Sequence, residues 1–481
     1  MPRAPFSLRI LCAAALLGLS ACGGSGGGAG FVFSAPAGTS GPATPQTPET
    51  PAAPQTPEAP AGPETPAAPR ALGVELRGFI GDQVVLRNGS DEITLDEDGS
   101  YSFATPLAVG ASYAVSVRSQ PGTLTRSCTV SDGSGTMPAS GTVGVSVVCS
   151  APPVRYAYAS LVGSNQIAGW SIDAADGHAT SAVTTVSSGL YPIALTADPA
   201  GRFLYTLNFL SGTIDIWQIG LAGSLGKVGT TTLGGIGQSG LVIEPRGRFL
   251  YVVSRDTNEV LKYAVDPVQG TLSDRTTVML AGPRPNAMTV DPSGRHLYVA
   301  SQDANWVESF AIDQATGELT VMPGGPVSTG LTPMALATDP KGRFVYSYDS
   351  DGMTVSVLRR DRVTGALVAA SSEPVAGRGY SLAVEPGGRM LHAIGATPSN
   401  IGSFTIDAVT GALAGAGTIA EGGVGFNRVA MDPNGLFMLV SAEGPGQVYG
   451  YSVNPATGAA AKAAWPNLSV GPSPSAVVLT R

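Results

Sequence analysis

One short motif returns along the last two thirds of the chain at a nearly constant interval. It has the approximate form I-D-x-x-T-G-x-L, and successive motif glycines lie 46 to 48 residues apart. These glycines are Gly177, Gly223, Gly270, Gly317, Gly365, Gly411 and Gly458. A regular interval of this length is typical of a repeat architecture in which every copy folds as the same small unit.

A second motif, D/E-P-x-G-R followed by an apolar strand, alternates with the first. Its copies begin at Asp198, Glu244, Asp291, Asp339, Glu385 and Asp432. The two ends of the region supply the missing copy, because 155–158 matches the middle of a unit and 474–480 matches its first strand. Joining these ends completes a ring, which a solenoid does not need. We therefore predict an all-β fold with a seven-bladed β-propeller over 154–481, closed by its N- and C-terminal strands.

A smaller β region precedes the repeats. Residues 71–150 contain short alternating segments separated by turn pairs such as Asn88-Gly89 and Asp98-Gly99. We predict a small Ig-like β-sandwich here. Cys128 and Cys149 are an even pair in this region, and we expect them to form one disulfide. Two buried free thiols are the alternative.

The N-terminus predicts export. A short basic region is followed by an apolar run from Ile10 to Leu19 and then by L-S-A-C, ending at Cys22. This segment resembles a bacterial lipobox, which implies a signal peptide over 1–21 and a lipid on Cys22; an ordinary secretory signal with a chance cysteine is the alternative. Residues 22–70 are rich in glycine and proline and predict a tether. We expect the protein in the cell envelope, at the outer membrane by analogy with such lipoproteins, facing either the periplasm or the exterior.

Composition and motifs exclude several function classes. Only 13% of the residues are charged, the net charge is −8, and no basic cluster follows the first ten residues, so nucleic acid is not an expected partner. No metal-ligand cluster, nucleophile elbow or phosphate-cradling loop occurs, and we expect neither a metal nor a cofactor. We interpret His296 and His392 as packing residues within the repeat, and the arginines of the second motif as structural ion-pair partners.

Candidate binding residues lie where the repeat is broken, because packing does not require them there. The connections just before each innermost strand should reach the mouth of the central channel, and they carry Tyr191, Gln238, Arg284, Thr332, Arg378, Tyr380, Asn427 and Arg428. Arginines with tyrosines suit a small anionic ligand. The turns between second and third strands form another irregular set, which includes Arg255, Asn258, Asp303, Asn305, Trp306, Asp349 and Asp351.

The repeats also resemble a known family. The pattern P-x-A-x-x-x-D-P-x-G-R-F-L-Y-V, followed by V-x-V-x-x-I-D and T-G-x-L, is similar to that of bacterial lactonase-type propellers, which include propeller 6-phosphogluconolactonases and YVTN-repeat surface proteins. The family's enzymes carry a G-P-R-H signature and a later N-E pair. Here Pro285 stands in place of the histidine in 282–286, and 300–303 reads Ala-Ser-Gln-Asp.

These observations favour an anchored binding module that takes a small anionic ligand, a glycan or a protein. The alternative is a hydrolase that opens a sugar lactone or a similar ester. An enzyme needs a base within reach of Arg284, Arg378 and Arg428, whereas a binding module needs only the positive groups.

Overall fold

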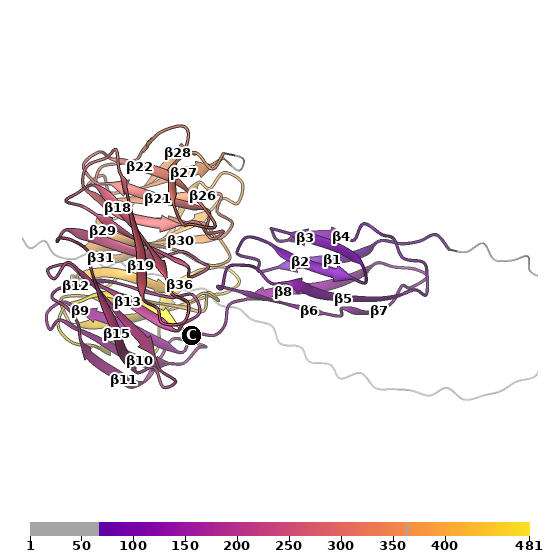
Figure 1. The fold of residues 1–481 in the computed structure, drawn as a ribbon, viewed down its shortest axis with the longest axis horizontal. Coiled ribbons are helices and arrows are strands. Elements are labelled where there is room, and N and C mark those ends of the chain that lie inside the picture. The colour runs from indigo at the N-terminus through magenta and orange to yellow at the C-terminus, as the bar shows by residue number, and fades with distance from the viewer. Residues whose placement is uncertain (1–66, 362–363) are drawn as a thin grey trace, which may run out of the picture. The chain divides into compact units, whose positions relative to one another are not determined.

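The computed structural model describes residues 67–361 and 364–481, which fold into β-sheets joined by short turns (Figure 1). The predicted signal peptide and most of the predicted tether, including Cys22, lie outside the described residues. The all-β class is confirmed. Within the part of the chain that the structure describes, no helix has the length and apolar character that a membrane crossing requires.

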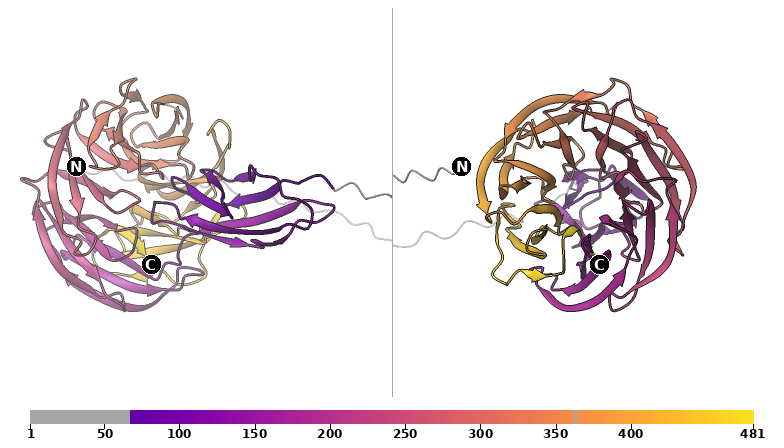
Figure 2. Two further views of the ribbon diagram at one scale, coloured as in Figure 1. Left: turned by 45° about the vertical axis from the view of Figure 1, so that its right-hand side comes forward. Right: turned by 90° about the vertical axis from the view of Figure 1, so that its left-hand side faces the viewer.

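The repeat region forms a ring of seven blades, each a sheet of antiparallel strands (Figure 2). Within blades 2 to 7 the strands follow the chain from the channel outward. The strands of blades 1 to 4 are β9 (Tyr156–Leu161), β10 (Gln166–Ile172) and β11 (Ala179–Ser187); β12 (Pro192–Ala197), β13 (Phe203–Asn208), β14 (Thr213–Ile219) and β15 (Leu225–Thr232); β16 (Gln238–Ile243), β17 (Phe249–Ser254), β18 (Glu259–Val265) and β19 (Leu272–Met279); and β20 (Pro285–Val290), β21 (His296–Ser301), β22 (Trp306–Ile312), β23 (Leu319–Val321) and β24 (Val327–Ser328).

The remaining blades continue the same order. They consist of β25 (Pro333–Thr338), β26 (Phe344–Asp349), β27 (Thr354–Arg360) and β28 (Leu367–Pro374); β29 (Arg378–Val384), β30 (Met390–Thr397), β31 (Ser399–Ile406) and β32 (Leu413–Ala420); and β33 (Phe426–Met431), β34 (Phe437–Ala442), β35 (Gln447–Val453), β36 (Ala460–Lys462) and β37 (Leu468–Ser469). The last strand, β38 (Pro474–Thr480), pairs with β9 as the innermost strand of blade 1. The predicted closure by strands from both ends is therefore confirmed, and the right-hand view of Figure 2 shows the ring.

The glycine of the first repeat motif makes a contact between neighbouring blades. Gly270 has φ 72°, and a Cβ atom there would lie 2.5 Å from the ring of Phe203 in the preceding blade. Its carbonyl oxygen accepts a hydrogen bond of 2.9 Å from the hydroxyl of Tyr205. Tyr158, Tyr251 and Tyr346 donate in the same way to Gly223, Gly317 and Gly411. Glycine and tyrosine thus recur together because each pair joins two blades.

This contact predicts a stability change for Tyr205→Phe. The variant keeps the ring but leaves the buried Gly270 carbonyl without its donor, so we expect the free energy of unfolding to fall by about 1–3 kcal/mol. Tyr156→Phe is the matched control, because the Tyr156 hydroxyl donates to the Leu221 carbonyl at an exposed position. Its expected change is within about 0.5 kcal/mol. Thermal unfolding of both variants measures the difference, and equal effects would contradict the proposed role of the buried bond.

His392 occupies the tyrosine position of blade 6. It is fully buried, its Nε2 lies 3.1 Å from the Gly458 carbonyl, and its Nδ1 lies 3.0 Å from the Ser403 hydroxyl. A neutral ring that donates from Nε2 and accepts at Nδ1 satisfies both partners. The predicted packing role of His392 is confirmed.

Burial lowers the pKa of His392, and this predicts acid sensitivity. In the unfolded chain His392 is protonated near pH 6.5, whereas in the folded chain it stays neutral to a lower pH. The free energy of unfolding present above about pH 6.5 therefore falls as the pH decreases toward the lowered pKa. His392→Tyr restores the hydroxyl of the other blades and does not titrate in this range. We expect its melting temperature to change less than that of the wild type between pH 7 and pH 5. His392→Gln, which keeps a neutral donor, should share the flatter profile, and a wild-type slope in both variants would contradict the prediction.

The second repeat motif closes a turn within each of blades 2 to 7. The Arg202 Nη2 lies 3.0 Å from Asp198, and the Arg343 Nε lies 3.1 Å from Asp339. Arg389 pairs with Glu385 at 3.2 Å. These ion pairs confirm the structural interpretation for Arg202, Arg343 and Arg389.

Residues 72–150 form two four-stranded sheets with a shared apolar core that includes Leu72, Leu86 and Val145. Their strands are β1 (Leu72–Arg77), β2 (Val84–Asn88), β3 (Asp91–Leu95), β4 (Gly99–Ser102), β5 (Ser112–Ser119), β6 (Ser127–Ser131), β7 (Ser134–Thr136) and β8 (Val143–Ser150). Cys128 and Cys149 form the predicted disulfide between β6 and β8. The Ig-like topology stays a prediction.

Candidate functional site

The innermost strands of all seven blades surround a central channel. A cavity of about 200 Å³ inside it is lined by residues from β12, β16, β20, β25, β29, β33 and β38. Most of the lining is alanine, glycine, leucine and valine. At one end the channel opens into a wider cavity of about 430 Å³, which we call the mouth cavity. Ser239, Asn286 and Arg428 line both and therefore lie where they meet.

Irregularities in the innermost strands direct side chains into the mouth cavity. Each of these strands shifts register against its neighbour close to its first residue. A residue that the ladder skips is released from regular pairing and re-aims its side chain. The skipped residues that line the mouth cavity are Ile193, Ser239, Asn286, Met334, Tyr380, Asn427, Arg428 and Ser475. The same register shift thus recurs in every blade, and the skipped residues together form the floor of the cavity.

The wall of the mouth cavity comes from a second repeated position, the first residue after a blade's second strand. Val162, Phe209, Arg255 and Glu443 occupy this position and line the cavity. Each donates its backbone N–H to the carbonyl of the connection that precedes the innermost strand; Arg255, for example, bonds Gly237 at 2.9 Å. The turn between second and third strands is therefore held against the connection.

Buried carboxylates and asparagines fix these connections further. The backbone N–H of Gly189 donates to Asp215, that of Gly282 to Glu308, and that of Gly330 to Asp349, at 2.7 to 3.0 Å. Three asparagines in the turns accept from the next connection, and they are Asn165, Asn258 and Asn305. Burial raises the pKa of Asp349, whose partners among the described residues are hydroxyl and N–H groups. Several polar residues of the predicted turn set thus hold the mouth rigid.

Arg428 is the distinctive charge of the site. Its Nη1 donates to the Tyr380 carbonyl at 2.7 Å, and among the described residues no carboxylate pairs with it. Arg428 is half-buried, and partial removal from water lowers the pKa of its guanidinium. A guanidinium stays protonated at neutral pH, so four of its five N–H groups remain for another acceptor.

Two further charged groups line the same cavity. Arg255 is half-buried and Glu443 is exposed. Within residues 67–361 and 364–481, neither side chain forms an ion pair. Both were absent from the predicted mouth set, although Arg255 belongs to the predicted turn set. Aligning the repeats on the residue after each second strand would have placed both in one ring.

Four predicted residues line the mouth cavity, namely Tyr191, Tyr380, Asn427 and Arg428, and four do not. The Thr332 hydroxyl donates to Asp351 instead. The side chain of Gln238 is buried, because it pairs in the regular ladder before the bulge. Arg284 lies 3.4 Å from Asp303, and Arg378 lies 3.2 Å from Asp351, both in exposed ion pairs. The predicted cluster of three arginines is therefore not present; Arg255 is the second arginine of the cavity.

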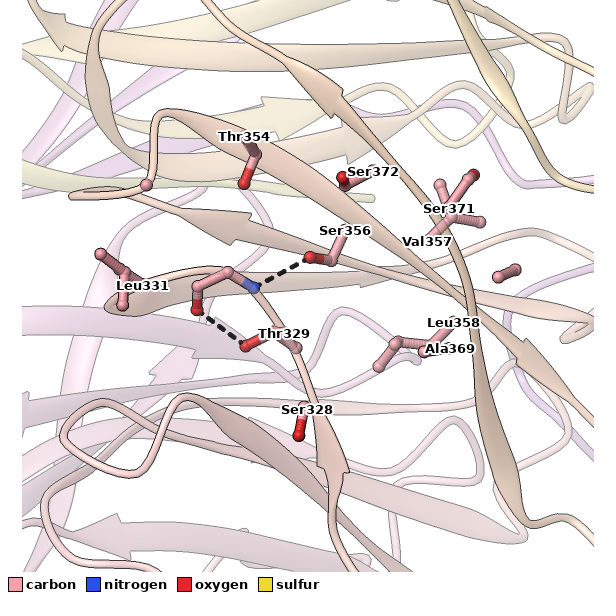
Figure 3. Close-up of a pocket in the computed structure, with 13 residues that line it drawn as sticks. Ser328, Thr329, Leu331, Thr354, Ser356, Val357, Leu358, Ala369, Ser371 and Ser372 are labelled. Atoms are coloured by element: carbon pink, nitrogen blue, oxygen red, sulfur yellow. Dashed lines mark hydrogen bonds between the residues drawn. The ribbon is translucent and has the colours of Figure 1, made fainter.

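A second cavity of about 520 Å³ lies between blades 4 and 5, where the outer strand of blade 4 is interrupted (Figure 3). Small and hydroxyl side chains line it, including Ser328, Thr354 and Ser371, and no charged residue does. The Ser356 hydroxyl is used within the protein, because it contacts Asp349 and the Gly330 N–H. Among the described residues no group of three or more His, Cys, Asp or Glu side chains is placed to hold a metal ion.

Comparisons with known proteins agree with the ring. Residues 111–237 and 227–324 match the family model "Lactonase, 7-bladed beta-propeller", which begins in the small β region and ends before blade 5. No curated protein matches significantly. A periplasmic gluconolactonase of Pseudomonas aeruginosa shares 20% identity and a TM-score of 0.60, covering 68% of this chain and 99% of its own.

Two other solved structures give similar values. A putative 6-phosphogluconolactonase of Bacteroides uniformis shares 18% identity with a TM-score of 0.60, covering 68% of this chain and all of its own. A functionally unknown protein of Desulfotomaculum acetoxidans shares 14% identity with a TM-score of 0.56, covering 68% and 99%. At these identities the likeness shows the fold. Together with the family match over residues 111–324 and the closed ring, it supports a seven-bladed β-propeller of the lactonase type.

Proposed function

We propose that the propeller binds a small organic anion of the hydroxy-acid class, or the corresponding lactone, in its mouth cavity. The observation that supports this most is Arg428, a half-buried cation without a carboxylate partner among the described residues, at the point where cavity and channel meet. Removing a guanidinium even partly from water is unfavourable, and a bound carboxylate offsets that cost. The cation is thus better explained by a ligand than by stability.

The neighbours of Arg428 suit the rest of such a ligand. Asn286 and Ser239 present an amide and a hydroxyl at the same place, and these groups hydrogen-bond to alcohols. Arg255 adds a second positive group to the wall. A cavity of about 430 Å³ is within the usual range for small-molecule sites.

Calorimetric titration of the purified protein tests the proposal. Gluconate should bind and the neutral polyol sorbitol should not, because only the acid engages the unpaired guanidinium. Arg284→Gln is the control, since Arg284 is already paired on the surface outside the cavity, and it should leave gluconate affinity unchanged. Absence of binding by any organic acid, or equal binding of sorbitol and gluconate, would reject the proposal.

Lactone hydrolysis is a second candidate, favoured by the position of Glu443 in the same cavity as both arginines. A carboxylate can take a proton from water as the water oxygen adds to the lactone carbonyl. The ring C–O bond then breaks, the proton passes to the leaving alkoxide, and a hydroxy acid forms. Two of the compared structures are described as a gluconolactonase and a putative 6-phosphogluconolactonase.

Proton release from glucono-δ-lactone distinguishes the two candidates. If the protein is an enzyme, Glu443→Gln should lower kcat by about 10²- to 10⁴-fold, the usual contribution of a general base. Its affinity for gluconate should persist or rise, because a negative group leaves the cavity. Hydrolysis no faster than in buffer would remove this candidate and leave the binding function.

We also propose that a lipid on Cys22 holds the protein at the cell envelope, an inference that rests on the sequence around Cys22. The Cys128–Cys149 disulfide is consistent with an oxidising compartment. Metabolic labelling with palmitate should mark the wild type and not Cys22→Ala. Label on the variant would contradict the assignment of the anchor.

A further inference from the structure

The mouth cavity is apolar on one side. Val162, Ile193, Phe209 and Tyr191 line it from blades 1 and 2. The rings of Tyr191 and Phe209 lie 6.2 Å apart between centroids, tilted by 58°. Because Arg255 follows in blade 3 and Glu443 precedes in blade 7, charged groups flank this apolar side at both ends.

The apolar side continues out of the cavity onto the rim of blade 2. Leu190 and Leu210 are 54% and 52% exposed, and the Leu210 N–H donates to the Leu190 carbonyl at 3.2 Å. They lie next in the chain to Tyr191 and Phe209, which are paired by a backbone bond of 2.9 Å. Two exposed leucines thus lie one residue away from the two aromatic residues of the cavity, and we call these four residues the blade 2 rim.

The fold does not require apolar residues at this place. The positions of Tyr191 and Leu210 correspond in blade 4 to Arg284 and Asp303, which form an ion pair. In blade 5 they correspond to Thr332 and Asp351, whose side chains are joined by a hydrogen bond of 2.8 Å. A polar pair therefore satisfies the same backbone, and exposed leucines need another explanation.

We infer that the ligand of the mouth cavity carries an aliphatic or aryl group beside its acid or lactone group. This inference rests on the proposed function. With the acid at Arg428, the rest of the ligand leaves the cavity over Tyr191 and Phe209 and covers the blade 2 rim. The ligand class is therefore a medium-chain or aryl-substituted hydroxy acid or lactone rather than a fully hydroxylated sugar acid.

A homologous series of acids tests the inference. Each methylene buried on the rim should raise affinity about three- to fourfold, the equivalent of about 0.8 kcal/mol. Titration of the purified protein with 3-hydroxybutyrate, 3-hydroxyhexanoate and 3-hydroxyoctanoate should show this rise, with gluconate binding more weakly than the longest acid.

Two double variants test whether the blade 2 rim causes the rise in affinity with chain length. Leu190→Ser with Leu210→Ser should flatten the series and leave the affinity for 3-hydroxybutyrate and gluconate unchanged. Leu331→Ser with Met353→Ser is the matched control, because these residues are 57% and 48% exposed near blade 5 and do not line the mouth cavity; it should keep the full slope. Tighter binding of gluconate, or an unchanged slope in the blade 2 variant, would overturn the inference and leave the proposed function intact. No binding of any acid would instead reject the proposed function.

Discussion

Deletion of residues 474–481 should abolish cooperative unfolding of the propeller. These residues form β38, which pairs along its length with β9 and packs beside β12 and β33. Without it blade 1 loses its innermost strand, β9 becomes an unpaired edge facing the channel, and the buried side chains of Ala476 and Val477 are lost. Thermal unfolding and limited proteolysis of the truncated protein measure the outcome.

Adding the missing strand as a peptide distinguishes loss of ring closure from non-specific destabilisation of the truncated protein. A synthetic peptide of residues 471–481 should restore protease resistance to the truncated protein, because it supplies the missing strand without a covalent link. A truncated protein that melts at the wild-type temperature would contradict the structural importance of this strand.

Arg428→Gln should weaken binding of an organic acid by about 30- to 5,000-fold, since removing one partner of a hydrogen-bonded charge pair that the ligand buries costs about 2–5 kcal/mol. Arg428→Lys keeps the charge but not the planar fork, and we expect an intermediate loss. In the absence of ligand, Arg428→Gln should be at least as stable as the wild type, because it removes a partly desolvated charge that has no carboxylate partner among the described residues.

The two measurements on Arg428→Gln must be combined. Calorimetry gives the affinity and thermal unfolding without ligand gives the stability. Weak binding with undiminished stability indicates a ligand-binding role. A lower melting temperature with unchanged affinity would show that Arg428 supports the fold instead, and would contradict the proposal.

The ring was predictable from the sequence because its contacts require particular residue types at both partners. The hydrogen bond from Tyr205 to Gly270 needs a hydroxyl in one blade and a glycine with positive φ in the next. A motif that carries both residues at fixed spacing therefore predicts the contact between blades as well as the strands of each blade. Closure followed from the matching partial units at 155–158 and 474–480.

The mouth cavity was only partly predictable, because the sequence does not indicate where a strand shifts register against its neighbour. Gln238 and Ser239 are adjacent, yet the bulge leaves Gln238 buried and turns Ser239 into the cavity. Arg284 was expected at the mouth, but Asp303 on the neighbouring turn pairs with it. Arg255 and Glu443 each follow the second strand of their own blade, and they line one cavity only because blades 3 and 7 belong to the same ring.

The bulges affect how the sequence of such a protein can evolve. A residue skipped by the ladder is not required by the blade's own packing, and the seven innermost strands each contribute at least one to the same cavity. Asn286 and Met334 occupy equivalent places in adjacent blades although they differ in polarity. Substitutions at these positions can accumulate without loss of the ring, so the scaffold can acquire a new ligand by a few independent changes around one opening.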